Sequence, residues 1–429
     1  MKTFMDWIER TLAPAAARIS EQRHLASLRD GLISIVPFLI IGSLVVMILN
    51  LPITGWSDLA VIKFIKPHGV NIWNGTMGIA SLLAAFGIGA SLAQKYKMDS
   101  TIGGLMSVAA LVAVTPEVTG AWGMPFLTAG WLFTAMVTAI CATEIYHFFV
   151  KRNMVIKMPD GVPPAAVKSF AALIPGTAVL ITFVAVRGLV FAAFGISVND
   201  VILKVFEPLK ILGGSLGGAL VAVLLVHILW AVGIHGGTIV FTIFGPFFLQ
   251  AATENADAFA AGSAAPNIVT GPMLDIFVYV GGAGASLSLA FLFAFLAKSQ
   301  QLRSLGKLAV GPALFNINEP ILFGTPMIMN PVMLIPFVTV PLVTTLTTYF
   351  AMASGIVPKT IAMAPWTSPV IMGPLVSTGS VTGVVLQLVN VGIGFAIYYP
   401  FFRIWDKMKL SEELGAKAAQ EKTAPQAAS

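Results

Sequence analysis

One acidic side chain, Glu319, lies in a stretch of the sequence whose neighbours are uncharged. Asn316 and Asn318 precede it, Pro320 follows it, and long apolar runs flank the stretch on both sides. A charged group at membrane depth is costly, so it normally faces a partner, a wet cavity or a substrate. Prolines break helices, and irregular backbone at that depth is tolerated only where protein covers it or where it lines a cavity. We therefore predict an interrupted or re-entrant helix that presents Asn318 and Glu319 to a pocket.

The amides of Asn316 and Asn318 together with the Glu319 carboxylate suit a neutral sugar. Each sugar hydroxyl both donates and accepts hydrogen bonds, so it can pair with an amide and with an acceptor-only carboxylate. The alternative is a polar plug that stabilises the broken helix, with Glu319 capping exposed backbone amides. We favour the binding role because the carboxylate would otherwise be too costly to keep.

A histidine, His235, ends an apolar run and is surrounded by Gly233, Gly236 and Gly237. The lack of side-chain bulk allows a ligand or another backbone to approach closely. The alternative is a packed histidine that a neighbouring carbonyl satisfies. His227 lies deeper in the same apolar run, and we assign it that structural role.

The third candidate is Trp366, which is held between Pro365 and Pro369. An aromatic face can stack on the apolar face of a sugar ring, and the indole N–H offers one hydrogen bond. A place in the interfacial aromatic belt of a membrane protein explains such a tryptophan equally well.

The composition defines the class of protein. Of 429 residues, 57% are hydrophobic and 10% are charged, whereas a soluble domain usually carries about 25% charged residues. The net charge of +6 comes from cations in short loops, where they set membrane topology, and it does not indicate nucleic acid binding. The mean hydropathy of +0.88 agrees with a polytopic membrane protein.

Cofactors and metals are not indicated. Cys141 is the single cysteine, so neither a disulfide framework nor a cysteine metal site is expected. Glu144 and His147 have a metal-ligand spacing on a helix, but a second set of ligands is missing. The sequence has no P-loop pattern, so we predict no ATP site.

We predict an all-α polytopic membrane protein of about ten transmembrane helices, with re-entrant hairpins and amphipathic interfacial helices. A tenth span must come from the apolar material at 237–250, 307–330 or 355–376. Basic loops place the N-terminus in the cytoplasm, and the loops at 116–124 and 251–267, which lack Lys and Arg, fit the outside. The nine other expected spans are 31–50, 73–94, 101–116, 125–150, 167–195, 214–234, 275–297, 332–352 and 380–403.

The charge pattern also suggests a domain organisation. An amphipathic segment at 1–30 precedes a first transmembrane domain at 31–197, and an amphipathic linker at 198–213 leads to a second at 214–410. The polar end of the chain, 411–429, is rich in Ala, Lys and Gln, and we expect it to be disordered.

At these residues the sequence resembles a known family, the membrane-embedded IIC component of the lactose/cellobiose (diacetylchitobiose-type) branch of the bacterial sugar phosphotransferase system. The Asn318-Glu319-Pro320 block is highly specific, whereas the Gly-x-His-Gly piece around His235 alone would be weak. The resemblance covers nearly the whole chain and includes the stretches 153–160, 169–176, 233–236, 317–324, 329–333 and 364–367.

The resemblance implies a multi-pass protein of the bacterial inner membrane, with ten spans and re-entrant hairpins. It implies a homodimer formed through the first domain and an occluded sugar pocket in the second. His235 and Glu319 would lie near the sugar hydroxyl that is phosphorylated, and Trp366 would pack near the sugar. The phosphoryl group would come from a phosphocysteine on a separate IIB protein, supplied in turn by IIA and HPr.

The resulting hypothesis is a permease for a β-linked disaccharide similar to cellobiose or diacetylchitobiose. Glu319 would act as a general base or orient the hydroxyl, and His235 would stabilise charge. The chain would take part in phosphotransfer only within the complete complex. The alternative is an ion-coupled sugar symporter in which Glu319 carries a proton. The accumulated sugar would be unmodified in a symporter and phosphorylated in a permease of the phosphotransferase type.

Overall fold

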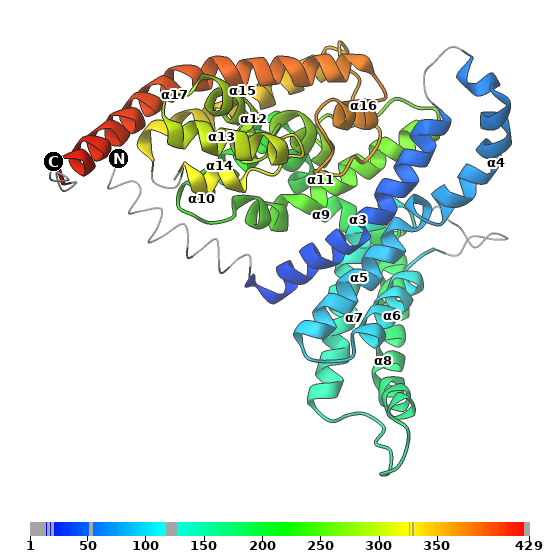
Figure 1. Cartoon of the computed structure of the whole chain (residues 1–429). Helices are drawn as coiled ribbons and strands as arrows, with labels where there is room; N and C mark the ends of the chain where they lie inside the picture. The colour runs from blue at the N-terminus through cyan, green and yellow to red at the C-terminus, as the bar shows by residue number, and fades with distance from the viewer. Residues whose placement is uncertain are drawn as a thin grey trace.

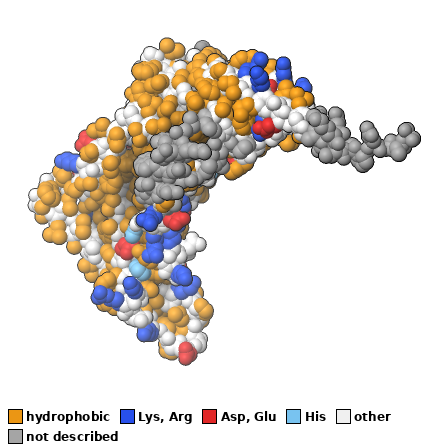
Figure 2. All heavy atoms as spheres, turned by 90° about the vertical axis from the view of Figure 1, so that its left-hand side faces the viewer, with side chains coloured by type: hydrophobic (Ala, Val, Ile, Leu, Met, Phe, Trp, Pro, Cys, Tyr) orange, Lys and Arg blue, Asp and Glu red, His pale blue; other side chains and the backbone are white. Residues whose placement is uncertain are grey.

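The structure, a computed structural model, describes residues 14, 18, 21–50, 55–116, 127–325, 327 and 330–423. Within these ranges every regular element is a helix. Seven helices are long and apolar enough to cross a membrane, or nine if each of two bent helix pairs counts as one span. Apolar side chains cover most of the face shown in Figure 2, and charged side chains gather in limited patches. The all-α polytopic prediction is confirmed.

The first half of the chain forms a helical bundle that projects below the rest of the molecule (Figure 1). Small residues allow its helices to pack closely, as is common between membrane helices. A Cβ atom added to Gly89 of α5, for example, would lie 2.0 Å from Ser107 Oγ of α6. The bundle consists of α3 (Arg23–Leu49), α5 (Ala80–Lys95), α6 (Ser100–Ala113), α7 (Leu132–Lys151) and α8 (Pro164–Phe194).

Part of the connection between the first two expected spans, 31–50 and 73–94, is helical. Helix α4 (Ala60–Asn74) stands at the edge of the molecule in Figure 1 and follows the short 3-10 turn η2 (Trp56–Asp58). Only Ile62 and Gly69 of this helix are buried. The apolar residues on either side of Lys63 and Lys66 recur at helical spacing, which favours a helix in this connection.

The predicted amphipathic segment at 198–213 is helix α9 (Val198–Gly214). Ser197 and Asp200 form a reciprocal capping box that fixes its start. The next helix, α10 (Leu216–Ala231), is bent from it by 70°. Helix α9 therefore runs in a different direction from the apolar helix that follows it.

The apolar segment at 237–250, one of the candidates for the tenth span, lies in helix α11 (Gly236–Ala260), which is long and apolar enough to cross a membrane. The helix continues through Pro246 as one helix of 25 residues. A proline removes only one backbone donor, and packing of the surrounding apolar side chains can outweigh that loss. Most of α11 is buried, so the helix belongs to the interior of the molecule.

The second half of the chain contains several short and irregular helices. The segment at 273–296 has two π-helical turns, and its two parts are bent from each other by 53°. Such irregular backbone is typical of functional regions in membrane transporters. The elements are η6 (Met273–Val278), η7 (Ala283–Ala285), α12 (Leu287–Phe291), η8 (Leu292–Leu296), α13 (Gln300–Ala313), α14 (Glu319–Gly324), α15 (Pro331–Ala353), α16 (Met372–Thr378) and α17 (Val381–Thr423).

The molecule has two hydrophobic cores. One consists mainly of residues between Leu28 and Val198, and the other of residues between Ala219 and Phe402. Helix α11 contributes to both, with Val240 in the second core and Ala252 in the first. The two cores agree with a division of the chain near α9. The domain boundaries at 31–197 and 214–410 stay predictions, and most of the expected amphipathic segment at 1–30 lies outside the described residues.

The expectation of disorder from residue 411 onward was wrong as far as Thr423. Helix α17 runs along the top of Figure 1 and continues to that residue. Ala, Glu, Lys and Gln are strong helix formers, so their enrichment supports a helix as readily as it suggests disorder. Glu413 also contacts the chain at 299–301, which anchors this part of the helix. Residues 424–429 lie outside the described residues.

The packing of α5 on α6 gives a first testable prediction. We expect Gly89→Ala to lower the free energy of unfolding by about 1–3 kcal/mol, because the added methyl group overpacks a close helix contact. Thermal unfolding in detergent measures the change. Gly392→Ala is the matched control, since a Cβ added there meets no atom within 4 Å. Equal melting temperatures for the two variants would contradict the prediction.

Candidate functional site

A glycine-rich loop at 281–284 forms the centre of the candidate site. Gly281, Gly282 and Gly284 have φ values of 87°, 93° and 79°, a conformation that glycine adopts at little cost. A Cβ atom added to Gly282 would lie 2.5 Å from Asn318 Cγ. The loop therefore needs glycine both for its backbone conformation and for the close approach of the segment that carries Glu319.

The two asparagines that precede Glu319 bind this loop. The Gly281 N–H donates to Asn316 Oδ1 at 2.7 Å, and Asn318 Nδ2 donates to the Ala283 carbonyl at 2.6 Å. Asn316 Nδ2 also donates to the carbonyl of Trp366 at 2.6 Å. Both side chains are buried. These contacts agree with the alternative of a polar plug, and sugar binding by Asn316 and Asn318 stays a prediction.

The other side of the loop is held by two residues of long helices. The Gly284 N–H donates to His227 Nε2 at 2.8 Å, and the Tyr398 hydroxyl donates to the Gly284 carbonyl at 2.7 Å. His227 Nδ1 lies 2.6 Å from the Val223 carbonyl, so the histidine links α10 to the loop. The structural role predicted for His227 is confirmed. The role of Tyr398 was missed, although a tyrosine in an apolar helix needs a hydrogen-bond partner.

Glu319 begins the short helix α14, directly after this anchored loop. Its side chain is exposed, and no cation among the described residues forms an ion pair with it. We had expected a carboxylate kept in an apolar interior. The correction is that Asn316 and Asn318 fill the interior positions, so the carboxylate projects outward and is available to a ligand.

His235 precedes the first residue of α11 and caps that helix. Its Nδ1 accepts the Thr238 N–H at 3.2 Å, so in the neutral ring the proton lies on Nε2. The imidazole packs against the Trp230 ring, with 4.6 Å between the ring centroids. A Cβ atom added to Gly236 would lie 2.0 Å from the Val226 carbonyl oxygen. The glycine next to His235 thus allows α11 to approach α10, and the exposed histidine presents an N–H donor.

Trp366 has a bound backbone and an exposed indole. The side chain is 56% exposed, while the carbonyl accepts the Asn316 hydrogen bond described above. The Val370 N–H donates to the Leu314 carbonyl at 3.0 Å, which fastens the same loop to the segment before Glu319. Hydrogen bonds therefore bring the Trp366 loop, Asn316 and Asn318 together. His235 contacts Trp230 of α10, the helix whose His227 binds the 281–284 loop, and among the described residues no hydrogen bond joins His235 to Glu319.

A second polar cluster lies in the first half of the chain, around Glu144 of α7. His24 Nε2 is 2.8 Å from Glu144 Oε1, and the Tyr96 hydroxyl binds the same oxygen. The His147 ring stacks on Tyr96 with 3.7 Å between the centroids. Among the described residues no group of three His, Cys, Asp or Glu side chains could hold a metal ion. The Glu144–His147 spacing therefore belongs to a network that joins α3, α5 and α7.

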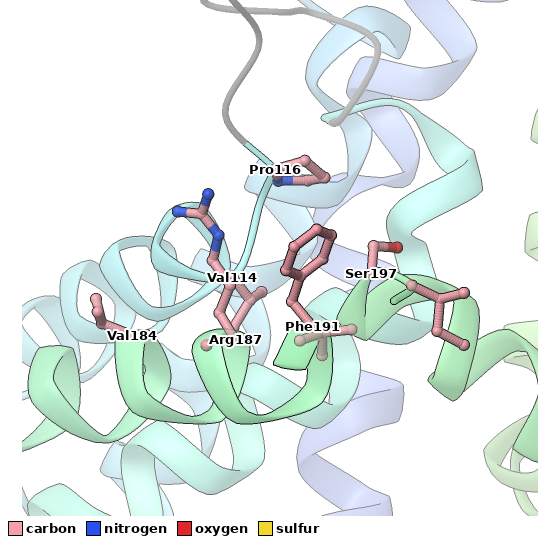
Figure 3. Close-up of a pocket in the computed structure, with 9 residues that line it drawn as sticks. Val114, Pro116, Val184, Arg187, Phe191 and Ser197 are labelled. Carbon is pink, nitrogen blue, oxygen red and sulfur yellow. The ribbon is translucent and has the colours of Figure 1, made fainter. Parts of the chain in front are cut away.

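A cavity of about 550 Å³ is also found in this half of the molecule (Figure 3). Its walls come from the end of α6, from α8 and from the start of α9, and they include Arg187, Phe191 and Ser197. None of the predicted site residues lines it. The cavity is apolar except for Arg187 and Ser197 and is separate from the candidate site.

The fold and this site define a class of protein. Broken helices and glycine-rich irregular backbone in the middle of an apolar helical bundle are typical of membrane transporters. A family model described as the phosphotransferase system EIIC component matches residues 29–341. The chain belongs to this family, as the sequence resemblance predicted, and is thus a multi-pass protein of the inner membrane.

Individual relatives are similar over nearly their whole length. The lichenan permease IIC component of Bacillus subtilis (strain 168) is 45% identical, with 95% of this chain and 94% of the relative covered. The cellobiose-specific EIIC component of Geobacillus stearothermophilus is 44% identical, with 96% of each covered. The crystal structure of ChbC, the IIC component of the N,N'-diacetylchitobiose-specific phosphotransferase system, has a TM-score of 0.90 and 42% identity, with 95% of this chain and 99% of that chain covered.

The contacts of Asn316 and Trp366 separate a structural role from a binding role. We expect Asn316→Ala to lower the free energy of unfolding by about 2–3 kcal/mol, because it leaves the Gly281 N–H and the Trp366 carbonyl without partners. Trp366→Ala removes an exposed side chain and should change stability by no more than about 0.5 kcal/mol. Thermal unfolding without sugar measures both. An unchanged melting temperature for Asn316→Ala would show that its hydrogen bonds do not stabilise the loops.

Proposed function

We propose that the chain is the permease of a phosphotransferase system for a β-linked disaccharide similar to cellobiose or diacetylchitobiose. The observation that carries the proposal is the division of roles around the 281–284 loop. Asn316 and Asn318 bind backbone groups, while the Glu319 carboxylate and the Trp366 indole remain exposed on segments that these hydrogen bonds hold together. An exposed carboxylate and an exposed aromatic ring on connected segments suit a sugar, which offers hydroxyl donors and an apolar ring face.

The names of the relatives support this substrate class. They are described as components for lichenan, cellobiose and N,N'-diacetylchitobiose, all of which contain β-linked sugars. Family membership also supports phosphorylation during uptake, with the phosphoryl group delivered by EIIB and replenished through EIIA and HPr. It does not support the ion-coupled symporter as an alternative.

In the proposed reaction the 6-hydroxyl of the sugar attacks the phosphorus of the phosphocysteine on EIIB. The new O–P bond forms as the S–P bond breaks, the hydroxyl proton moves to the Glu319 carboxylate, and the cysteine leaves as a thiolate. His235, whose Nδ1 caps α11, can donate its Nε2–H to a phosphoryl or hydroxyl oxygen. The sugar phosphate is anionic and cannot return through an apolar path, so uptake is directional.

Transport requires the site to reach both sides of the membrane. The two hydrophobic cores support a movement of the second half of the chain as a rigid body relative to the first. The first half would be anchored in a homodimer. Helix α8 supports this proposal because it exposes large apolar side chains such as Ile181, Leu189 and Phe191, each at least 65% exposed, which a second copy or lipid must cover.

The test is sugar phosphorylation by membrane vesicles that contain the protein and are loaded with EIIB and a phosphoryl-donor system. We expect Glu319→Gln to abolish phosphorylation of cellobiose, a loss of at least about a hundredfold for a general base, because the amide cannot accept the hydroxyl proton. Thermal unfolding should stay unchanged, since the side chain is exposed.

Glu412→Gln is a suitable control for the loss of one exposed carboxylate, because Glu412 lies on α17 and pairs with Lys409 at 2.7 Å. A normal rate for Glu319→Gln would exclude its role as the base. Accumulation of unmodified cellobiose by the unaltered protein would exclude the permease function itself.

A further inference from the structure

Helix α13 begins against the side chain of a distant acidic residue, Asp406 of α17. Asp406 Oδ1 accepts the N–H groups of Lys298 and Ser299, both at 2.9 Å. Its side chain is only 5% exposed. Among the described residues no cation forms an ion pair with it, so backbone N–H groups supply its hydrogen bonds.

A second acidic residue of α17 completes this contact. Glu413 Oε1 accepts the Ser299 hydroxyl at 2.6 Å and the Gln301 N–H at 2.8 Å, and its Oε2 accepts the Gln300 N–H at 3.0 Å. Glu413 follows Asp406 by two helical turns, which places both carboxylates on the same face of α17. Four successive backbone N–H groups at the start of α13 therefore point to one face of another helix.

The chemistry of these contacts makes them strong. The first N–H groups of a helix have no partners within it, and they favour negative charge because of the helix dipole. Hydrogen bonds to an ionised carboxylate are about twice as strong as those between neutral groups. Ser299 itself caps the helix through its hydroxyl, which accepts the Leu302 N–H at 3.2 Å. Its hydroxyl therefore links Glu413 to the first turn of α13.

The far end of α13 leads directly to the candidate site. The helix ends at Ala313, and its last carbonyls bind the chain that follows, with the Asn316 N–H donating to Ala313 at 3.0 Å. Helix α14 packs on α13, since a Cβ atom added to Gly324 would lie 2.4 Å from Leu305 Cδ1. A shift of the start of α13 must therefore be transmitted to Asn316 and to Glu319.

We propose that the C-terminal part of α17 is a brace that sets the position of the α13–α14 segment, with Asp406 and Glu413 as positioning residues for the sugar site. The proposal rests on the function proposed above, in which Glu319 acts on the sugar. The brace assigns a role to the acidic residues near the end of α17, which are far in sequence from the site.

The test compares Glu413→Gln with Glu412→Gln in the full-length protein in membranes. The two residues are neighbours and lose the same charge, but Glu412 pairs with Lys409 and makes no hydrogen bond to α13 among the described residues. We expect Glu413→Gln to lower the turnover of cellobiose phosphorylation by about tenfold to a hundredfold, as small displacements of catalytic groups do. We expect faster amide hydrogen exchange across 298–318 in the same variant, and wild-type behaviour for Glu412→Gln.

Ser299→Ala provides a milder variant that keeps both carboxylates and removes only the hydroxyl contact with Glu413. We expect Ser299→Ala to lower the turnover and to speed amide exchange at 298–318, both by less than Glu413→Gln does. Unchanged exchange at 298–318 in Glu413→Gln, or an equal loss of turnover in Glu412→Gln, would overturn the brace. Hydrogen exchange does not depend on the chemical role of Glu319. A normal rate of sugar phosphorylation by Glu319→Gln would therefore overturn the proposed function, while hydrogen exchange in Glu413→Gln would still test the brace separately.

Discussion

The structure around the candidate site depends on satisfying the backbone of a short glycine loop away from water. An unpaired N–H or carbonyl in an apolar interior costs several kcal/mol, and at 281–284 the short 3-10 turn η7 and the backbone hydrogen bonds of Gly282 leave several of these groups without backbone partners. Side chains supply the missing partners instead. Asn316 and Asn318 bind one side of the loop, and His227 and Tyr398 bind the other. This requirement joins α10, α17 and the segment before Glu319 into one polar centre within the second hydrophobic core.

The same requirement explains why Glu319 can serve a ligand. The neighbouring amides already stabilise the broken backbone, so the carboxylate is not needed for that purpose and remains exposed. The same division is found at Trp366, because Asn316 binds its backbone carbonyl while its indole is exposed. A permease of the phosphotransferase family needs both properties. In the proposed function the site keeps its geometry during transport and leaves polar groups available to a sugar and to an incoming phosphoryl group.

Several features could be predicted from the sequence because they depend on composition and local pattern. The membrane class followed from 57% hydrophobic residues, and the helix at 198–213 followed from its amphipathic pattern. Other features of the helices were not predicted from local preference. Helix α11 continues through Pro246, α4 forms part of the connection between the first two expected spans, and α17 extends to Thr423. Buried apolar side chains hold α11, and hydrogen bonds from Glu413 to residues 299–301 anchor the end of α17.

By itself, the sequence determined that this is a membrane protein of the EIIC family. It also determined which residues to consider as the site, because rare polar groups in apolar runs and a specific Asn-Glu-Pro block are visible without coordinates. These residues are Asn316, Asn318, Glu319, His235 and Trp366. Only the tertiary structure decided how those residues divide between structure and ligand. An asparagine amide can bind a sugar or a peptide group equally well, and the choice depends on whether a backbone loop from elsewhere in the chain reaches it. The loop at 281–284 reaches the side chains of Asn316 and Asn318 and forms hydrogen bonds with them. No part of the described chain forms such a bond with the Glu319 carboxylate.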